Sequence, residues 1–486
     1  MTDRRTALAA TLCLAVAVAA CGGGGGDDGG GGTAESGDCP VEALADIPAD
    51  DPVTVTLWAA MSADQAETMD SLAAAYNDSQ DKVDVKVENA GGANDELLRK
   101  FTRGIPTGDI PEIAIFDDTV TQFMADSGVV MPAQACIDAE QYDTGDWLQP
   151  AMDSYTIDGA LYPASANLST ILFYFNKNHF VRAGLDPNDP PGTLAEVREA
   201  AEALKAAGVT DKPLVLKMAS WLVEYQLTGD GAPVVNENNG RSGDGATEAA
   251  IDNPQALELY TWLDDMVDDG LLDPKNDVEN QYDHFLAMAN QQSSMSMESS
   301  GAITAVVAFL NNGDLPSVEG TDTSDLPEVD PSALDIGAAP IPGLSEPGQV
   351  QVGGNAWYMT NTGTDEQLAA TWDFLKWINQ PAQQVVWNLE GSYIPFNTKA
   401  LDDPELQDRW QNTLSGQWLA LANEQVSTGL DPDFPGPLIG PYAEFRSTIR
   451  DSLDSMVFEE ATPDDAIAAA ASAITASLEK YADENF

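Results

Sequence analysis

The sequence has few basic residues. Among 486 residues, 21 lysines and arginines stand against 80 aspartates and glutamates, and the formal net charge is −59 at pH 7. The acidic residues are spread along the chain rather than gathered in one tail. Nucleic-acid binding needs a basic surface, so this balance argues against it. The charge favours solubility but does not show that a ligand is cationic, because a local pocket can oppose the overall field.

The motifs of common enzymes are also missing. The only two histidines, His179 and His284, lie in no metal-binding spacing and are predicted to be surface or structural residues. There is no P-loop, no GxSxG motif, no GxGxxG after a strand and no CxxC pair. A glycosidase with paired carboxylates stays open, since any such pair carries little information in so acidic a chain. The loop at 236–244 offers oxygen ligands without EF-hand spacing, a weak calcium signal. We therefore expect no catalysis, metal or cofactor.

No long hydrophobic run is present after the N-terminal segment. In residues 1–20, Arg4 and Arg5 precede an apolar stretch that is shorter than the roughly 20 residues of a membrane-spanning helix. This pattern is typical of a signal peptide. It ends in small residues before Cys21, which resembles the lipobox of bacterial lipoproteins, where the cysteine carries the lipid. An ordinary signal peptide with an incidental cysteine is the alternative. The Gly-rich start of 21–52 predicts a flexible, lipidated tether.

The chain has only four cysteines. Cys13 would leave with the signal peptide and Cys21 would carry the lipid. Cys39 and Cys136 remain, and an even remainder in an exported protein suggests a disulfide. Two unpaired buried thiols are the alternative.

Alternating strand and helix patterns predict an α/β protein. Strands are expected at 53–57, 83–87, 113–116 and 171–175, each rich in β-branched or aromatic residues. Helices are expected to begin at the capping residues Ser62, Thr193, Thr364 and Thr462. Strands that alternate with helices imply a largely parallel sheet covered by helices, and the last part of the chain is mostly helical.

From Val53 onward the chain resembles the extracellular solute-binding proteins of the maltose-binding class. The segments that carry the resemblance are VTVTLWAAM, IPEIAIFDD, DSGVVMP, ILFYFNKNHFVRAGLDPNDPPGTLAEV, DIGAAPIPG and GSYIPFN, in this order between Val53 and Asn397. The family usually has Tyr-Asn-Lys where this chain has Phe175-Asn176-Lys177. The resemblance implies a two-lobed periplasmic-binding-protein fold (type II-like), with a ligand cleft between the lobes at a hinge.

The same resemblance implies a function and a location. The protein would be an exported monomer, lipid-anchored to the outer face of the cytoplasmic membrane. It would pass a small molecule to the permease of an ABC importer, with ATP hydrolysis in a separate subunit. We expect residues 53–163 and 302–352 in the first lobe, and 164–301 and 353–486 in the second. An exported hydrolase and a surface adhesin are the rival interpretations, but the sequence marks no catalytic group and no repeats.

Within this class the chain looks most similar to proteins that bind glycerol 3-phosphate or glycerophosphodiesters; a sugar ligand is the alternative. MESSGAI, VGGNAWYM and GSYIPFN resemble ligand-lining segments of that subfamily. Carried over by position, the predicted ligand residues are Asn94, Asp118, Ser169, Trp221, Ser299, Ser300, Gly354, Tyr393 and Arg446. Serine hydroxyls and a glycine N–H suit hydroxyl or phosphate oxygens, and an arginine can hold phosphate through two hydrogen bonds.

Several of these positions have a structural alternative. Trp221 could pack in a core, Tyr393 could brace the turn before its Ile-Pro, and Arg446 could form a surface ion pair. Ser299 and Ser300 could cap a helix. Two positions depart from the subfamily: Asn94 stands for a tyrosine and Asp118 for a glutamate, so a sugar or another phosphodiester stays open as the ligand.

Overall fold

The computed structural model of the chain describes residues 39–89, 94–243, 245–277, 283–312, 334–348, 350–431 and 433–485. The predicted signal peptide, Cys21 and most of the predicted tether lie outside the described residues. In the described ranges, no helix combines the length and the hydropathy that a membrane crossing requires.

Six strands form the first sheet, in the order β2-β1-β3-β13-β4, with β7 also paired to β13. Their bounds are β1 Val53–Ala59, β2 Val83–Asn89, β3 Ile113–Asp117, β4 Val130–Met131, β7 Ser165–Ser169 and β13 Gly353–Thr360. β1 runs parallel to β2 and β3, whereas β13 is antiparallel to its neighbours. The carboxyl ends of β1, β2 and β3 therefore lie on one edge of the sheet, where loops bind ligands in α/β folds.

Five strands form the second sheet, in the order β10-β9-β11-β8-β12. Their bounds are β8 Ile171–Asn176, β9 Leu214–Lys217, β10 Leu272–Lys275, β11 Met295–Ser299 and β12 Ile336–Pro340. β8 is fully buried, and its side chains alternate between the two faces of the sheet. Leu172 and Tyr174 pack in one hydrophobic cluster, and Phe173 and Phe175 pack in another. This alternation is the period of two that a strand imposes. A short hairpin, β5 Thr156–Ile157 and β6 Ala160–Leu161, stands apart.

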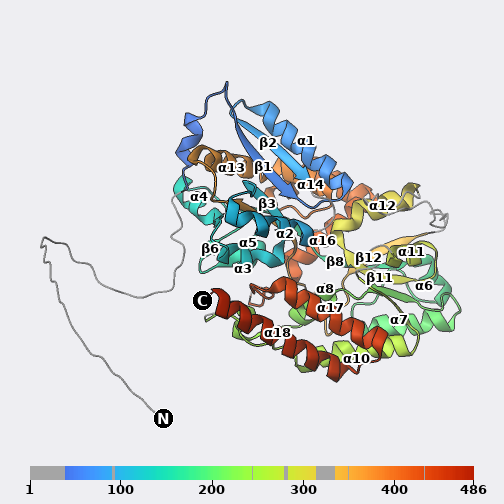
Figure 1. Cartoon of the computed structure of the whole chain (residues 1–486). Helices are drawn as coiled ribbons and strands as arrows, with labels where there is room; N and C mark the ends of the chain where they lie inside the picture. Colours follow the sequence, from blue (N-terminus) through green and yellow to red (C-terminus); the bar gives the residue numbers. More distant parts are fainter. Residues whose placement is uncertain are drawn as a thin grey trace, which may run out of the picture. The chain divides into compact units, whose positions relative to one another are not determined.

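Helices cover both sheets (Figure 1). They are α1 Ala63–Ser79, α2 Asn94–Gly104, α3 Thr121–Asp126, α4 Ala133–Glu140, α5 Gln149–Tyr155, α6 Lys177–Ala183, α7 Leu194–Ala206, α8 Ser220–Gly229, α10 Pro254–Asp268, α11 Asp283–Ala289, α12 Ile303–Asn312, α13 Asp365–Ile378, α14 Pro381–Gly391, α15 Pro404–Asn412, α16 Leu414–Gly429, α17 Tyr442–Glu459 and α18 Pro463–Asn485. The short segment α9, Asn236–Gly240, is a turn with left-handed backbone angles rather than a right-handed helix. Capping boxes at Ser62, Thr193 and Thr364 confirm three predicted helix starts. Helices α10, α17 and α18 contact one another beside α8 (Figure 1).

The strand pairing corrects part of the predicted lobe division. Residues 302–352 were expected in the first lobe, yet β12 pairs with β8 in the second sheet. Residues 353–486 were expected in the second lobe, yet β13 pairs with β3 in the first sheet and α13 packs on β1. The chain crosses between the sheets at Thr170 and again between β12 and β13. A strand's pattern reports burial but not its pairing partner, which explains the error. Residues 165–169 were expected in the second lobe, yet they form β7, which pairs with β13 in the first sheet. The remaining lobe boundaries stay predictions.

A disulfide joins Cys39 to Cys136, the two cysteines that the count left over. It ties the start of the described chain to α4, across a sequence separation of 97 residues. A bond that closes so long a loop restricts the unfolded chain, with a typical stabilisation of about 3 kcal/mol. We expect reduction, or Cys136→Ser, to lower the unfolding free energy by about that amount in urea denaturation. An unchanged midpoint under reducing conditions would contradict this prediction.

Candidate functional site

The first crossover brings together residues from three separate segments. Ser169 ends β7 and Thr170 precedes β8, so the chain passes from one sheet to the other here. The Ser300 N–H donates to the Thr170 carbonyl at 2.7 Å, and the Thr170 N–H donates to the Ser300 hydroxyl at 3.1 Å. Ser300 is fully buried, and its hydroxyl oxygen is already an acceptor. Ser299 caps the short helix η4, Ser300–Ala302, because its hydroxyl accepts a hydrogen bond from the Gly301 N–H. This is the helix-capping role that the sequence suggested as the alternative to ligand binding.

Gly354 lies beside this crossover because β13 pairs with β7. Its neighbour Gly353 is opposite Ser169 in the register, and Gly354 is opposite Leu168. Gly354 has φ of 123°, and a Cβ there would lie 1.9 Å from the Asn167 carbonyl oxygen. Only glycine tolerates both the backbone conformation and this close approach. The position therefore requires glycine for structural reasons, whether or not its N–H also meets a ligand.

Arg446 lies between two carboxylates rather than free in the cleft. Its Nε and Nη2 each donate to Glu224 at 3.0 Å, and its Nη1 donates to Asp117 at 3.0 Å. Asp117 ends β3 in the first sheet, whereas Glu224 lies on α8 and is fully buried. Tyr442, one turn before Arg446 on α17, donates to Glu224 at 3.1 Å. Burial would lower the pKa of Arg446, but Asp117 and Glu224 outweigh this effect and raise it.

Asp118 is a carboxylate in an unfavourable environment. It follows Asp117, and Tyr155 is its hydrogen-bond donor at the long distance of 3.4 Å. Burial, followed by the charge of Asp117, raises the pKa of Asp118 well above its ordinary value. Tyrosines surround it: burial raises the pKa values of Tyr155 and Tyr225, and the charge of Asp118 adds to both increases. A hydroxyl donor from a ligand would satisfy this carboxylate.

This pKa shift predicts a stability effect. A raised pKa means that the native state binds the proton more tightly than the unfolded chain, so ionised Asp118 destabilises the fold at high pH and the cost disappears as the pH falls toward the ordinary Asp value. We expect Asp118→Asn to raise the unfolding free energy at pH 7, with a gain that shrinks on acidification, as measured by urea denaturation at several pH values. Asp252→Asn at an exposed carboxylate is the control. A loss of stability at pH 7 would contradict the prediction.

Sequence reasoning missed Arg241. It follows a turn in which Glu237, Asn238 and Asn239 all have left-handed backbone angles, a conformation that asparagine tolerates better than most residues. Asn239 fixes the turn by accepting from the Val234 N–H at 2.8 Å. The only signal was a lone arginine in a loop rich in Gly, Asn and Asp, in a chain poor in basic residues.

The Arg241 guanidinium meets backbone carbonyls instead of carboxylates. Its Nε donates to the Gly436 carbonyl at 2.6 Å and its Nη1 to the Ser154 carbonyl at 3.1 Å. Among the described residues no carboxylate forms an ion pair with it. Burial lowers the pKa of Arg241 to about 10. A desolvated cation that no described carboxylate pairs with favours an anion from outside the protein.

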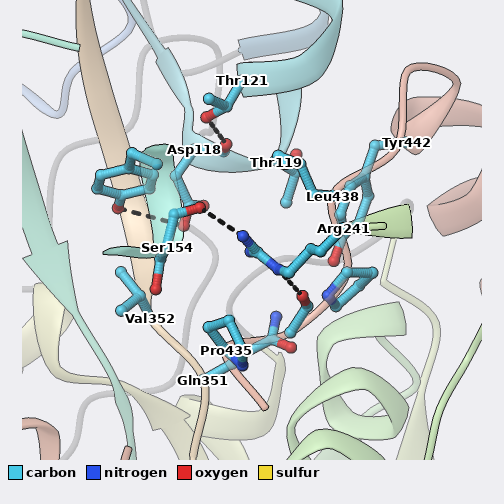
Figure 2. A pocket seen from close by; sticks show the side chains of 13 residues that line it. Asp118, Thr119, Thr121, Ser154, Arg241, Gln351, Val352, Pro435, Leu438 and Tyr442 are labelled. Carbon is cyan, nitrogen blue, oxygen red and sulfur yellow. Dashed lines mark hydrogen bonds between the residues drawn. The ribbon is translucent and has the colours of Figure 1, made fainter. Parts of the chain in front are cut away.

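Arg241 and Asp118 line the same small cavity, of about 20 Å³ (Figure 2). Figure 2 shows Asp118 beside Thr121 from the first lobe, with Arg241 and Tyr442 facing them across the cavity. The other lining residues include Ser154, Gln351 and Leu438. The space holds about one water molecule, so a larger ligand requires the two sides to separate.

The remaining predicted residues lie in other surroundings. Tyr393 stacks on Trp387 at 5.4 Å between ring centroids, and burial raises its pKa to about 12. Trp221 is half-buried against the core of the second sheet, with the Lys217 ammonium 6.0 Å from its ring centroid. Asn94 begins α2, and its buried Oδ1 has no hydrogen-bond partner among the described residues. None of these three residues lines the cavity beside Arg241.

The described residues contain no group of three or more His, Cys, Asp or Glu side chains arranged to hold a metal ion. Both histidines are buried. His179 Nδ1 lies 2.9 Å from the Ser294 hydroxyl, and His284 Nε2 lies 2.7 Å from Glu298 Oε2. Their partners give both histidines a structural role in the second lobe.

The sequence of this chain of two sheets and two crossovers matches a known protein family. The profile of the bacterial extracellular solute-binding proteins matches residues 71–413. The chain belongs to this family. Its members are binding subunits of ABC importers rather than enzymes, and the family implies export.

Relatives support this assignment. The sn-glycerol-3-phosphate-binding periplasmic protein UgpB of Brucella abortus (strain 2308) is 25% identical over 362 residues, which cover 73% of this chain and 77% of that protein. The GacH receptor of Streptomyces glaucescens has a TM-score of 0.69 at 20% identity, covering 88% of this chain and 98% of that chain. UgpB of Mycobacterium tuberculosis, in complex with glycerophosphocholine, has a TM-score of 0.68 at 18% identity, covering 88% and 99%. The two structures show that this solute-binding protein shares their two-lobed fold.

Proposed function

We propose that this solute-binding protein captures glycerol 3-phosphate or a glycerophosphodiester outside the cytoplasmic membrane and delivers it to an ABC permease. The observation that carries the proposal is Arg241: a desolvated guanidinium, with no carboxylate partner in the described chain, faces a carboxylate across the cavity. The phosphate would take the N–H groups that Arg241 does not use, and glycerol hydroxyls would donate to Asp118. The curated glycerol-3-phosphate-binding relatives support this ligand class.

This assignment moves the phosphate contact from Arg446 to Arg241. Arg446 already donates to Glu224 and Asp117, so a phosphate there would have to displace a carboxylate. Asp117 ends a strand of the first sheet and Glu224 lies on a helix beside the second, so Arg446 would act as a link between the lobes in the closed form. A ligand that contacts both sides would favour closure, and release to the permease would follow reopening.

A sugar is the second candidate. The observation that favours it is the pairing of Arg446 with two carboxylates, which leaves Asp117, Asp118 and Glu224 in excess over the two arginines. Carboxylates and tyrosines suit the hydroxyls and carbon faces of a neutral polyol. The GacH receptor, described with bound acarbose, has the same fold.

Calorimetric titration of the purified protein tests the ligand class. The panel contains glycerol 3-phosphate, glycerophosphocholine, glycerol, maltose and glucose. We expect a phosphate ester to bind, with glycerol alone at least tenfold weaker. Binding of a sugar with no response to either phosphate ester would overturn the phosphate assignment and support the second candidate. If no compound of the panel gives a heat of binding, both candidate ligand classes are contradicted.

We further propose that residues 1–20 are a signal peptide and that Cys21 carries a lipid anchor. The small residues before Cys21 and the Gly-rich segment after it support this proposal. Metabolic labelling with a radioactive fatty acid tests it, with Cys21→Ser as the matched variant. Equal labelling of both proteins would contradict the anchor.

A further inference from the structure

A second cavity, of about 230 Å³, lies between α11, α12 and one face of the second sheet, at the N-terminal end of α1. Figure 1 shows α11 and α12 on the same side of the molecule as β11 and β12. No residue that lines it lines the cavity beside Arg241. Ser62 and Gln65, at the start of α1, also line this cavity. The cavity is partly open to solvent, so a small molecule can enter it.

The walls of this second cavity are mainly apolar. Phe285 and Met288 come from α11, Ala305 and Phe309 from α12, and Ile336 from β12. An apolar cavity of roughly 150 Å³ in another protein stays free of water and binds benzene, so this one has room for a substituted ring.

Two hydroxyl groups on the sheet face have no partner. Tyr174 on β8 and Ser296 on β11 are paired in the register, so their side chains lie on the same face. Both residues are more than nine-tenths buried, both line the cavity, and neither Tyr174 Oη nor Ser296 Oγ has a hydrogen-bond partner in the described structure. An unpaired buried hydroxyl is costly, and a polar group on an occupant would remove that cost.

The charged residue of the wall is already satisfied. Glu298 Oε1 accepts from the Ser299 N–H at 2.7 Å, and Glu298 Oε2 lies 3.1 Å from the Lys217 ammonium and 2.7 Å from His284 Nε2. Because the carboxylate is matched by its own partners, an additional charge on an occupant would have no counter-ion. The free groups are the two hydroxyls, which suit an uncharged donor or acceptor.

We propose that the cavity between α11, α12 and the second sheet is a second binding site, for a small, uncharged and largely apolar molecule that carries one hydroxyl or carbonyl group. Its apolar part fills the space between Phe285, Met288 and Phe309, and its polar group bonds to Tyr174 and Ser296. This site is separate from the solute cavity at Arg241, so it does not depend on which solute the protein imports.

Benzyl alcohol and toluene are the probes, because they share a ring and differ in the hydroxyl. The readout is the NMR spectrum of the whole exported chain with ¹³C-methyl methionine. Met288 lines the cavity, whereas Met295 and Met297 on β11 face the opposite core and serve as internal controls. We expect benzyl alcohol to shift the Met288 signal, not those of Met295 or Met297, and to bind more tightly than toluene.

Variants sharpen the test. Tyr174→Phe removes only the unpaired hydroxyl. It should lower the affinity for benzyl alcohol roughly fivefold and leave the affinity for toluene unchanged. Ala305→Leu fills the cavity and should abolish binding of both probes. Tyr260→Phe, which alters a hydroxyl bonded to Ser452 in the other core, should change neither. The proposal is overturned if Met288 does not respond, if toluene binds as tightly as benzyl alcohol, or if Tyr174→Phe leaves both affinities unchanged.

Discussion

Replacement of Arg241 by alanine is expected to weaken phosphate-ester binding several hundred-fold. The guanidinium is desolvated, and among the described residues its hydrogen-bond partners are the carbonyls of Gly436 and Ser154, so a bound phosphate would be its counter-ion. Truncation of one partner of a buried, hydrogen-bonded charge pair typically costs about 2–5 kcal/mol of binding free energy, and several hundred-fold corresponds to about 3.5 kcal/mol. Calorimetric titration of the variant with the tightest phosphate ester measures the effect.

Three comparisons make this result specific. Arg241→Lys keeps a charge but loses the planar fork, and should retain part of the affinity. Arg198→Ala removes an arginine that pairs with Glu202 and Asp269 on the surface, and should leave affinity unchanged. If Arg241→Ala keeps the affinity of the unaltered protein while Arg446→Ala no longer binds the ligand, Arg446 rather than Arg241 is the residue that contacts the phosphate. If a neutral sugar is the ligand, both arginine variants can retain it.

Replacement of Arg446 by alanine is expected to lower the unfolding free energy by about 4 kcal/mol. Glu224 is fully buried and would lose its guanidinium partner, although Tyr442 would still donate to it. Asp117 would lose its link to the second lobe at the same time. Removal of one member of a buried ion pair is costly because the other charge stays in a poorly solvated position. Urea denaturation without ligand measures the change.

The matched control is Arg409→Ala. Arg409 also pairs with a glutamate, Glu390, but at 3.6 Å and with both side chains exposed, so its loss should cost less than about 1 kcal/mol. The double variant Arg446→Met, Glu224→Leu should recover part of the stability, because it removes both buried charges. Similar small losses in Arg446→Ala and Arg409→Ala would show that the Arg446 pairs do not hold the lobes together.

The sequence alone predicted much of the local structure. The capping boxes at Ser62, Thr193 and Thr364 start helices in the structure, and the strand patterns at 53–57 and 171–175 fall within β1 and β8. These signals involve neighbours in the chain, so they are readable without tertiary contacts. The family resemblance, carried by ordered segments over most of the chain, led to the same two-lobed fold that the comparisons show.

The candidate site was only partly accessible from sequence. Ser169 and Gly354 were named, and β-pairing brings their strands together, but through a backbone register that the sequence does not display. Arg241 was missed because the feature that marks it as a candidate phosphate contact is the lack of a carboxylate partner among the described residues. This feature is visible only in the folded chain.

What the sequence determined by itself is the α/β class, the helix starts, the export signal as a prediction and the family. What the tertiary structure decided is which sheet receives β12 and β13, and which arginine has its charge already matched. Asp117 and Arg446 are 329 residues apart, yet they form an ion pair. Residue type and spacing report what a side chain can bind, but a contact over such a separation depends on how two lobes and a returning C-terminal helix are packed, which the local pattern does not encode.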